Sequence, residues 1–212
     1  MKRDDIDLYK KRCFSLPFLC ETAPVRTYAR NQIVPLENSR IYIVQSGLVF
    51  IWETHLDGRQ VLVNILDGNS AIQIHNFVHA SYEMQIKKTS FLQITFLEAI
   101  DNQMNILHAL RKQTFMSEEL AAIHREKYVE HRLYFFLQFL KRHFGKEIKK
   151  EHYLIAVPIT HEELASAVNS TRPTITKLLT KMIDKNQVVY QQNGKNRWII
   201  LKPLFFSAAE PF

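Results

Sequence analysis

Apolar and polar residues are patterned in two different ways along the chain, and the change falls near residue 98. Between residues 28 and 96, short runs of β-branched and aromatic residues are separated by Ser46-Gly47 and by a polar turn at residues 56–59. Such runs are typical of strands. The expected strands lie at residues 41–44, 48–52, 61–66, 83–86 and 91–96. Many short strands joined by tight turns predict a small antiparallel barrel or roll.

Residues 98–144 instead repeat apolar side chains at spacings of three and four, which is the period of an amphipathic helix. A long helix is expected over residues 98–128, and a second helix that ends at Gly145. The long helix leaves a small roll, so little of its own domain can cover its apolar side chains. We therefore predict a dimer seam that includes Leu107, Leu110 and Leu120.

A strand is expected at residues 153–157, after a charged linker at residues 146–151, and it leads into a short helix. This helix begins with a capping box. The Thr160 hydroxyl can accept from an amide of the first turn, while Glu163 reaches back to the Thr160 amide.

A second short helix restarts at Arg172-Pro173, where the missing proline N–H costs nothing in a first turn. Ser170 or Thr171 is its expected N-cap. The helix buries one apolar stripe, formed by Ile175, Leu178, Leu179 and Met182. Two helices joined by a three-residue polar turn form a helix-turn-helix pattern, whose second helix can enter the major groove of DNA. The alternative is a packed helical hairpin with a solvated polar face.

Two further features favour DNA binding over that alternative. Asn193-Gly194 stands between two β-rich runs and suits a tight hairpin turn, so a wing should follow the two helices, with Lys195 and Arg197 near its tip. Residues 1–124 carry 13 Lys and Arg against 13 Asp and Glu, whereas residues 125–212 carry 15 against 8. The whole excess of +7 therefore lies with the motif, as expected for phosphate binding. The predicted DNA-contacting residues are Ser170, Thr171, Arg172, Pro173, Thr174, Thr176, Lys177, Lys181, Lys195 and Arg197.

Composition indicates an intracellular, globular protein. At 212 residues and 46% hydrophobic, the chain can bury one or two cores. It contains no run of about 18 uncharged apolar residues, and no apolar signal core follows its start, so we expect a soluble protein that is not secreted and has no membrane partner. Cys13 and Cys20 are expected to be ordinary buried thiols.

Neither catalysis nor metal binding is predicted. The sequence shows no Ser/His/Asp order, paired acids or metal cluster, so we expect no enzyme. His75 and His79 have the spacing of one helical face, yet they fall in an expected loop or strand. The alternative function from another class is a small-molecule-binding, cupin-like roll whose basic C-terminal domain is an interaction module.

The order of parts resembles the Crp/Fnr transcription regulators over nearly the full chain. The resemblance is carried by IYIVQSGLVFIWETHLDGRQVLVNIL, HRLYFFLQFLKRHFG and ITHEELASAVNSTRPTITKLLTKMI, and NSTRPTITKLL is most similar to the NtcA-type nitrogen regulators of cyanobacteria and plastids. It implies an α+β protein with a cyclic-nucleotide-binding-like β-roll at residues 1–97, a dimerisation helix at 98–128 and a winged helix-turn-helix at 129–212. It also implies a homodimer that binds double-stranded DNA and RNA polymerase in the cytoplasm, or in the plastid stroma if the chain is plastid-encoded.

The resemblance places Arg172 and Lys177 at the family's base-contacting positions, and implies half-sites of the GTA/TAC kind and a role in nitrogen control. Pro173 replaces the family's usual valine or glutamate, which removes one base contact. Lysine in place of arginine at position 177 weakens bidentate reading of guanine.

The sensor half departs from the family pattern. The stretch NSAIQIHNFVHASYEMQI lacks the Gly-Glu and Arg-Ser pairs of the cyclic-nucleotide members. In the NtcA-type proteins two arginines hold the carboxylates of 2-oxoglutarate, and here Ser81 and Gln113 occupy those positions, while Glu118 matches the family's helix glutamate. Binding of 2-oxoglutarate should therefore be weakened or lost. The cations that could substitute are Lys87, Lys88, Arg111 and Lys112.

Overall fold

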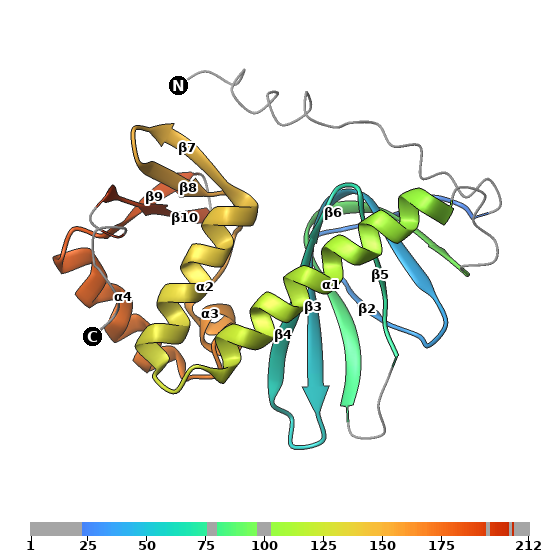
Figure 1. Ribbon diagram of the computed structural model, residues 1–212, viewed down its shortest axis with the longest axis horizontal. Coiled ribbons are helices and arrows are strands. Elements are labelled where there is room, and N and C mark those ends of the chain that lie inside the picture. Colours follow the sequence, from blue (N-terminus) through green and yellow to red (C-terminus); the bar gives the residue numbers. More distant parts are fainter. Residues whose placement is uncertain (1–22, 76–79, 97–102, 194–195, 204, 206–212) are drawn as a thin grey trace. The chain divides into compact units, whose positions relative to one another are not determined.

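The computed structural model describes residues 23–75, 80–96, 103–193, 196–203 and 205 (Figure 1). The chain divides into two compact units, residues 1–117 and 118–212. The division falls inside the long helix α1, Gln103–Arg125, and the two units are described separately.

The first unit is an antiparallel roll. Its strands are β1 Arg26–Tyr28, β2 Ile33–Pro35, β3 Ile41–His55, β4 Gln60–Asp67, β5 Ser70–Gln73 and β6 Ala80–Thr95. They pair in the order β1-β6-β3-β4, while β2 adds to β6 and β5 adds to β3. Every pairing is antiparallel, which confirms the predicted roll.

The strand boundaries expected within β3 and β6 were wrong. Residues 41–44 and 48–52 were expected to be two strands, but both belong to β3. Residues 83–86 and 91–96 were also expected to be two strands, but β6 runs from Ala80 to Thr95 without a turn. Between Val44 and Val49 the register of β3 against β6 shifts, so Ser46-Gly47 forms an irregularity of the bulge type and not a turn. Gly47 has a φ of 110°, and a Cβ there would lie 2.1 Å from Ser90 Oγ, so this position requires glycine.

Among the described residues, two apolar clusters lie in the first unit. The larger lies inside the roll and includes Tyr42, Val49, Ile51 and Met84. The smaller joins Ile41 and Ile43 of β3 and Ala71 of β5 to Ile106 and Ala109 of α1. This second cluster explains why the N-terminal part of α1 packs against the roll.

A polar contact also fixes α1 to the roll. Asn64 is fully buried on β4, and its Nδ2 donates to the Gln113 carbonyl at 3.0 Å and to Ser117 Oγ at 2.7 Å. A buried amide needs such partners, because an unpaired one is costly.

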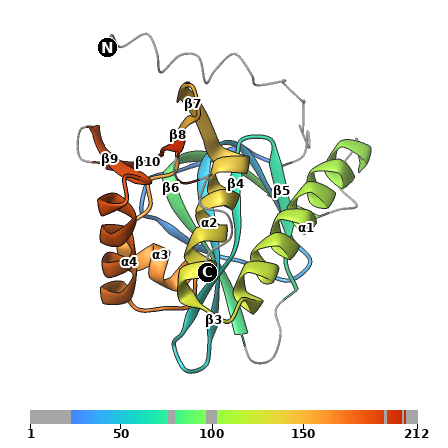
Figure 2. The same cartoon turned by 60° about the vertical axis from the view of Figure 1, so that its left-hand side comes forward.

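The second unit is a winged helix. It contains α2 Val129–Phe144, β7 Gly145–Lys149, β8 His152–Ile155, α3 His161–Ala167, α4 Arg172–Asp184, β9 Val188–Asn193 and β10 Asn196–Leu201. The sheet order is β7-β8-β10-β9, and the stacked rings of Phe136 and Phe139, 6.0 Å apart, contribute to the core. Figure 2 shows α3 beside α4 from a second direction.

Two expectations about this unit were wrong. Residues 146–151 were expected to be a charged linker, but residues 145–149 form β7, which pairs with β8. Their side chains are all exposed, as suits an edge strand rich in lysine. Leu120 was expected to be uncovered, yet it is only 1% exposed, because it shares the buried face of α1 with Met116 and Ile123.

Within the described residues, no helix has the length and apolarity of a membrane span.

Candidate nucleic-acid interface

The first helix of the motif, α3, starts at the predicted capping box. The Thr160 amide donates to Glu163 Oε2 at 2.9 Å, and the Glu163 amide donates to Thr160 Oγ1 at 3.2 Å. The helix buries Leu164 and Ala165. It is followed by Asn169 in the left-handed region, with a φ of 50°, which lets the chain turn sharply before α4.

Two side chains that sequence reasoning missed hold this turn. Arg132 of α2 donates through Nε to the Val168 carbonyl at 2.7 Å and through a terminal nitrogen to the Asn169 carbonyl at 3.1 Å. Its other terminal nitrogen donates to the Glu126 carbonyl at 2.8 Å. His124 Nε2 donates to the Ala167 carbonyl at 2.8 Å. Carbonyls at helix ends lack partners within the helix, so these donors stabilise the end of α3 and the segment after α1.

The second helix, α4, presents a polar face to solvent. Thr171 is the N-cap, and its hydroxyl accepts from the Thr174 amide at 3.4 Å. Ile175, Leu179 and Met182 are buried, whereas Leu178 is only half-buried. The predicted DNA-contacting residues that are exposed on α4 and its N-cap are Thr171, Arg172, Pro173, Thr174, Thr176, Lys177 and Lys181. The structure thus gathers most of the predicted DNA-contacting residues on one element.

Ser170 and Lys181 have structural contacts of their own. Ser170 is half-buried, and its amide donates to the Ala165 carbonyl at 2.8 Å. Lys181 donates to Glu130 Oε1 of α2 at 2.9 Å, so part of its charge is balanced within the unit. These two residues are therefore less suited to DNA contact than the residues at the start of α4.

The wing is formed by β9 and β10, which pair in register from Asn193↔Asn196 to Val188↔Leu201. Arg197 is exposed, and its guanidinium lies 4.2 Å from the centre of the Tyr190 ring. A cation above an aromatic face is attracted by the ring's π electrons, so Tyr190 holds Arg197 in place. The predicted contact Lys195, and Gly194 of the expected turn, lie outside the described residues.

His161, the first residue of α3, connects α4 to the wing, and sequence reasoning missed it. Its Nδ1 lies 2.9 Å from Thr176 Oγ1 and its Nε2 lies 2.8 Å from the Tyr190 hydroxyl. Burial lowers the pKa of His161, and the positive charges of Arg197 and Arg172 lower it further. Neither neighbour is close in the sequence, so only the position of a histidine at a helix start could have suggested this role.

The proposed effector residues are not brought together in a described contact. Ser81 is exposed on β6, opposite Thr54. Gln113 is only 3% exposed, and neither its Nε2 nor its Oε1 has a hydrogen-bond partner among the described residues. Glu118 is exposed and belongs to the second unit. Cys13, Cys20 and His79 lie outside the described residues, among which no group of three or more metal-ligating side chains occurs.

Comparison with known proteins agrees with this geometry. A family model described as a Crp-like helix-turn-helix domain matches residues 131–204. A putative HTH-type transcriptional regulator, ycf28, of Porphyra purpurea is 22% identical over 84% of this chain and 78% of its own. A global nitrogen regulator of Nostoc sp. is 24% identical over 86% of this chain and 87% of its own. The chain thus carries a Crp-like helix-turn-helix domain and is similar along most of its length to DNA-binding transcription regulators.

Solved structures of Crp/Fnr proteins share the fold. A CRP-family transcriptional regulator of Thermus thermophilus, TTHB099, aligns with a TM-score of 0.67 and 19% identity over 84% of this chain and 92% of its own. A cyclic nucleotide-binding domain containing protein of Listeria monocytogenes aligns with a TM-score of 0.69 and 16% identity over 94% of this chain and 97% of its own. At such identities these likenesses show the fold alone, and they confirm the α+β roll followed by a winged helix.

Proposed function

We propose that this chain is a regulator of the Crp/Fnr type that binds an inverted-repeat DNA site as a homodimer, with the start of α4 in the major groove. The observation that carries the proposal is the exposed polar face of α4 beside Arg197 of the wing, in the part of the chain that holds the whole excess of +7. A roll that binds small molecules while its basic domain serves only as an interaction module accounts for neither feature.

Arg172 is the proposed base-reading residue. It is exposed in the first turn of α4, and its guanidinium can donate to O6 and N7 of guanine together. Thr174 and Thr176 lie on the same helix and suit contacts to phosphate or to a thymine methyl. Lys177 supplies a further positive charge, while Pro173 leaves its neighbouring base pair less strictly read. Lys195 and Arg197 are the proposed phosphate contacts of the wing.

The exposed face of α1 is the proposed dimer seam. Leu107 is 50% exposed and Phe115 is 58% exposed, although both are large apolar side chains on a regular helix. They lie eight residues apart, which is a little more than two turns of the helix, and Leu110 between them is half-buried. The functional division into a roll at residues 1–97, a dimerisation helix at 98–128 and a DNA-binding domain at 129–212 follows from this assignment.

Nitrogen control is the physiological role that we propose, because relatives along most of the chain are global nitrogen regulators. RNA polymerase is the proposed partner at the promoter, in the cytoplasm or plastid stroma, and no catalytic activity is expected. The roll is not expected to bind the family's effector: Ser81 and Gln113 carry no positive charge, so 2-oxoglutarate should not bind. Titration calorimetry with 2-oxoglutarate tests this, and a micromolar dissociation constant would contradict it.

Selection of bound sequences from a random duplex pool tests the proposed function most directly. The purified full-length chain should enrich an inverted repeat whose half-sites are centred about 34 Å apart, one helical turn of DNA. Half-sites of the GTA/TAC kind are the expected outcome. Enrichment of no sequence, or of a single unrepeated site, would exclude a two-fold dimer that reads DNA through α4.

A further inference from the structure

His161 lies where three elements of the winged helix meet. One ring nitrogen is 2.9 Å from Thr176 Oγ1 on α4, and the other is 2.8 Å from the Tyr190 hydroxyl on β9. The Tyr190 ring in turn supports Arg197 of β10 at 4.2 Å. A single imidazole therefore links the proposed reading helix to the wing.

The protonation state of this imidazole decides which way the two hydroxyls donate. A neutral ring has one N–H and one lone pair, so either Thr176 or Tyr190 must donate its proton to the ring. An imidazolium donates from both nitrogens, so both hydroxyls accept from it. The hydroxyl that donated to the neutral ring is thereby released, so both O–H groups can then donate to another acceptor. Both arrangements use the same heavy-atom positions, so the change requires only rotation of hydroxyl hydrogens.

The surroundings keep the ring neutral in the free protein. Burial, then Arg197 and Arg172, lower the pKa of His161 below its usual value of 6.5. On its own helix, Glu162 is exposed, and Glu163 is engaged by the Thr160 amide. Burial raises the pKa of Tyr190, with a smaller opposing effect of Arg197, so this hydroxyl stays protonated at neutral pH. Positive charge thus dominates the field at the ring.

Bound DNA would reverse that field, because phosphates near Arg172 and Arg197 add negative charge and offset both guanidinium groups. We propose that His161 takes up a proton from solvent when this face binds DNA, and that Thr176 and Tyr190 then donate to phosphate oxygens. The inference rests on the proposed function and adds a positioning residue to it. His161 acts through the two hydroxyls.

DNA should bind more tightly at low pH than at high pH. The pKa of His161 should be higher in the complex than in the free protein. The added affinity is therefore fully present below the pKa of the free protein and is lost as the pH rises through the pKa of the complex. Each unit by which DNA raises this pKa corresponds to about a tenfold gain in affinity at low pH.

The test measures the dissociation constant of the full-length protein on a selected DNA duplex between about pH 5.5 and pH 8, at constant ionic strength, around the ordinary histidine pKa. His161→Gln keeps one donor and one acceptor but cannot be protonated, so it should lose the tightening at low pH. His152→Gln is the matched control, because His152 lies on β8 and, among the described residues, its ring hydrogen-bonds to the Lys150 carbonyl alone. It should behave as the wild type does.

Equal pH dependence in the wild type and His161→Gln would overturn the inference while leaving the proposed function intact. If the wild type binds no DNA at any pH, the proposed function itself fails. Should His161→Gln fold poorly, NMR of the wild-type protein with ¹³C-labelled histidine rings gives the same answer. The resonance of His161 should titrate at a higher pH with DNA than without it, and an unchanged or lower pKa would refute the proposal.

Discussion

At the scale of single residues, Arg172 is the side chain on which sequence reading should depend. Arg172→Ala should lower affinity for the selected site by about 1–3 kcal/mol and relax the choice at one base pair, because a bidentate contact to guanine is lost. Arg197→Ala on the wing should weaken matched and scrambled sites alike and reduce the slope of affinity against salt. Fluorescence anisotropy on both duplexes separates the two variants. Equal loss on both duplexes for Arg172→Ala would show that Arg172 only holds phosphate.

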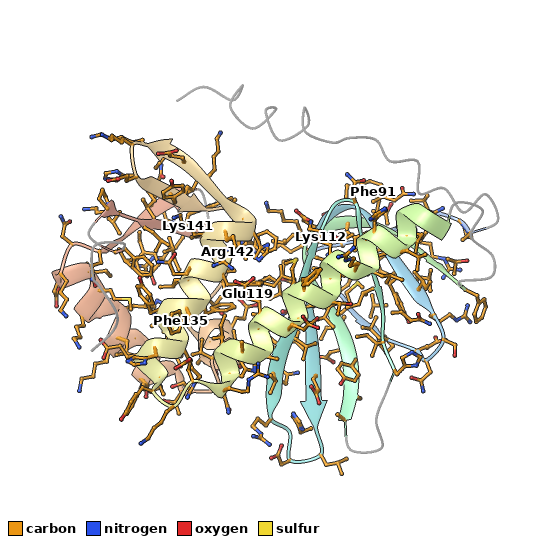
Figure 3. The ribbon with its side chains drawn as sticks, viewed as in Figure 1. Phe91, Lys112, Glu119, Phe135, Lys141 and Arg142 are labelled. Carbon is orange, nitrogen blue, oxygen red and sulfur yellow. The ribbon has the colours of Figure 1, made fainter. Side chains whose placement is uncertain are left out.

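Two arginines of α2 differ in how much the fold depends on them. Arg132 donates to backbone carbonyls around the turn before α4, whereas Arg142 is an exposed partner of Glu119 (Figure 3). Arg132→Ala should lower the free energy of unfolding by about 2 kcal/mol, because several carbonyls lose charged donors. Arg142→Ala is the matched control and should cost about 0–1 kcal/mol, as exposed ion pairs do. Denaturant unfolding measures both, and equal costs would contradict the role given to Arg132.

At the scale of elements, β3 offers a test of the irregularity at Gly47. Gly47→Ala places a Cβ against Ser90, in addition to straining a positive φ, so it should destabilise the roll by about 2 kcal/mol or more. Gly58 also has a positive φ, of 81°, but a Cβ there meets nothing within 4 Å. Gly58→Ala should therefore cost only the backbone strain, about 1 kcal/mol. Thermal unfolding of the two variants checks the difference, and similar melting temperatures would mean that Ser90 moves aside.

The elements also show what could be predicted from the sequence. The capping box at Thr160 and the start of α4 at Arg172 were predicted because their signals lie within a few residues of one another. Ser46-Gly47 was predicted to be a turn, because the same Ser-Gly pair is compatible with a turn and with a bulge. Only the pairing of β3 with β6, more than 30 residues away, distinguishes them. For the same reason the contact of His161 with Tyr190, 29 residues apart, was not predicted.

At the scale of the whole molecule, the proposed homodimer rests on large apolar side chains of α1 that are exposed in the single chain. The helical period places Leu120 on the buried face of α1, so Leu120 does not belong to the seam for which it was predicted. Leu107 and Phe115 remain exposed on the same helix. Arg111 lies 5.6 Å from the Phe115 ring, which leaves a charged group beside the apolar seam. Two copies of α1 that meet here would remove both large side chains from water.

Leu107→Glu and Phe115→Glu should therefore each shift the protein from dimer to monomer, because a charge buried in an apolar seam is costly. Leu56→Glu is the control, since Leu56 is 83% exposed in the turn between β3 and β4 and outside the proposed seam. Sizing by light scattering at about micromolar concentration, where a seam of this kind should hold two copies together, gives the result. The two seam variants should also lose affinity for the inverted repeat while Leu56→Glu keeps it. A monomeric wild type would overturn the proposed homodimer, whereas seam variants that remain dimeric would place the dimer contact elsewhere on the molecule.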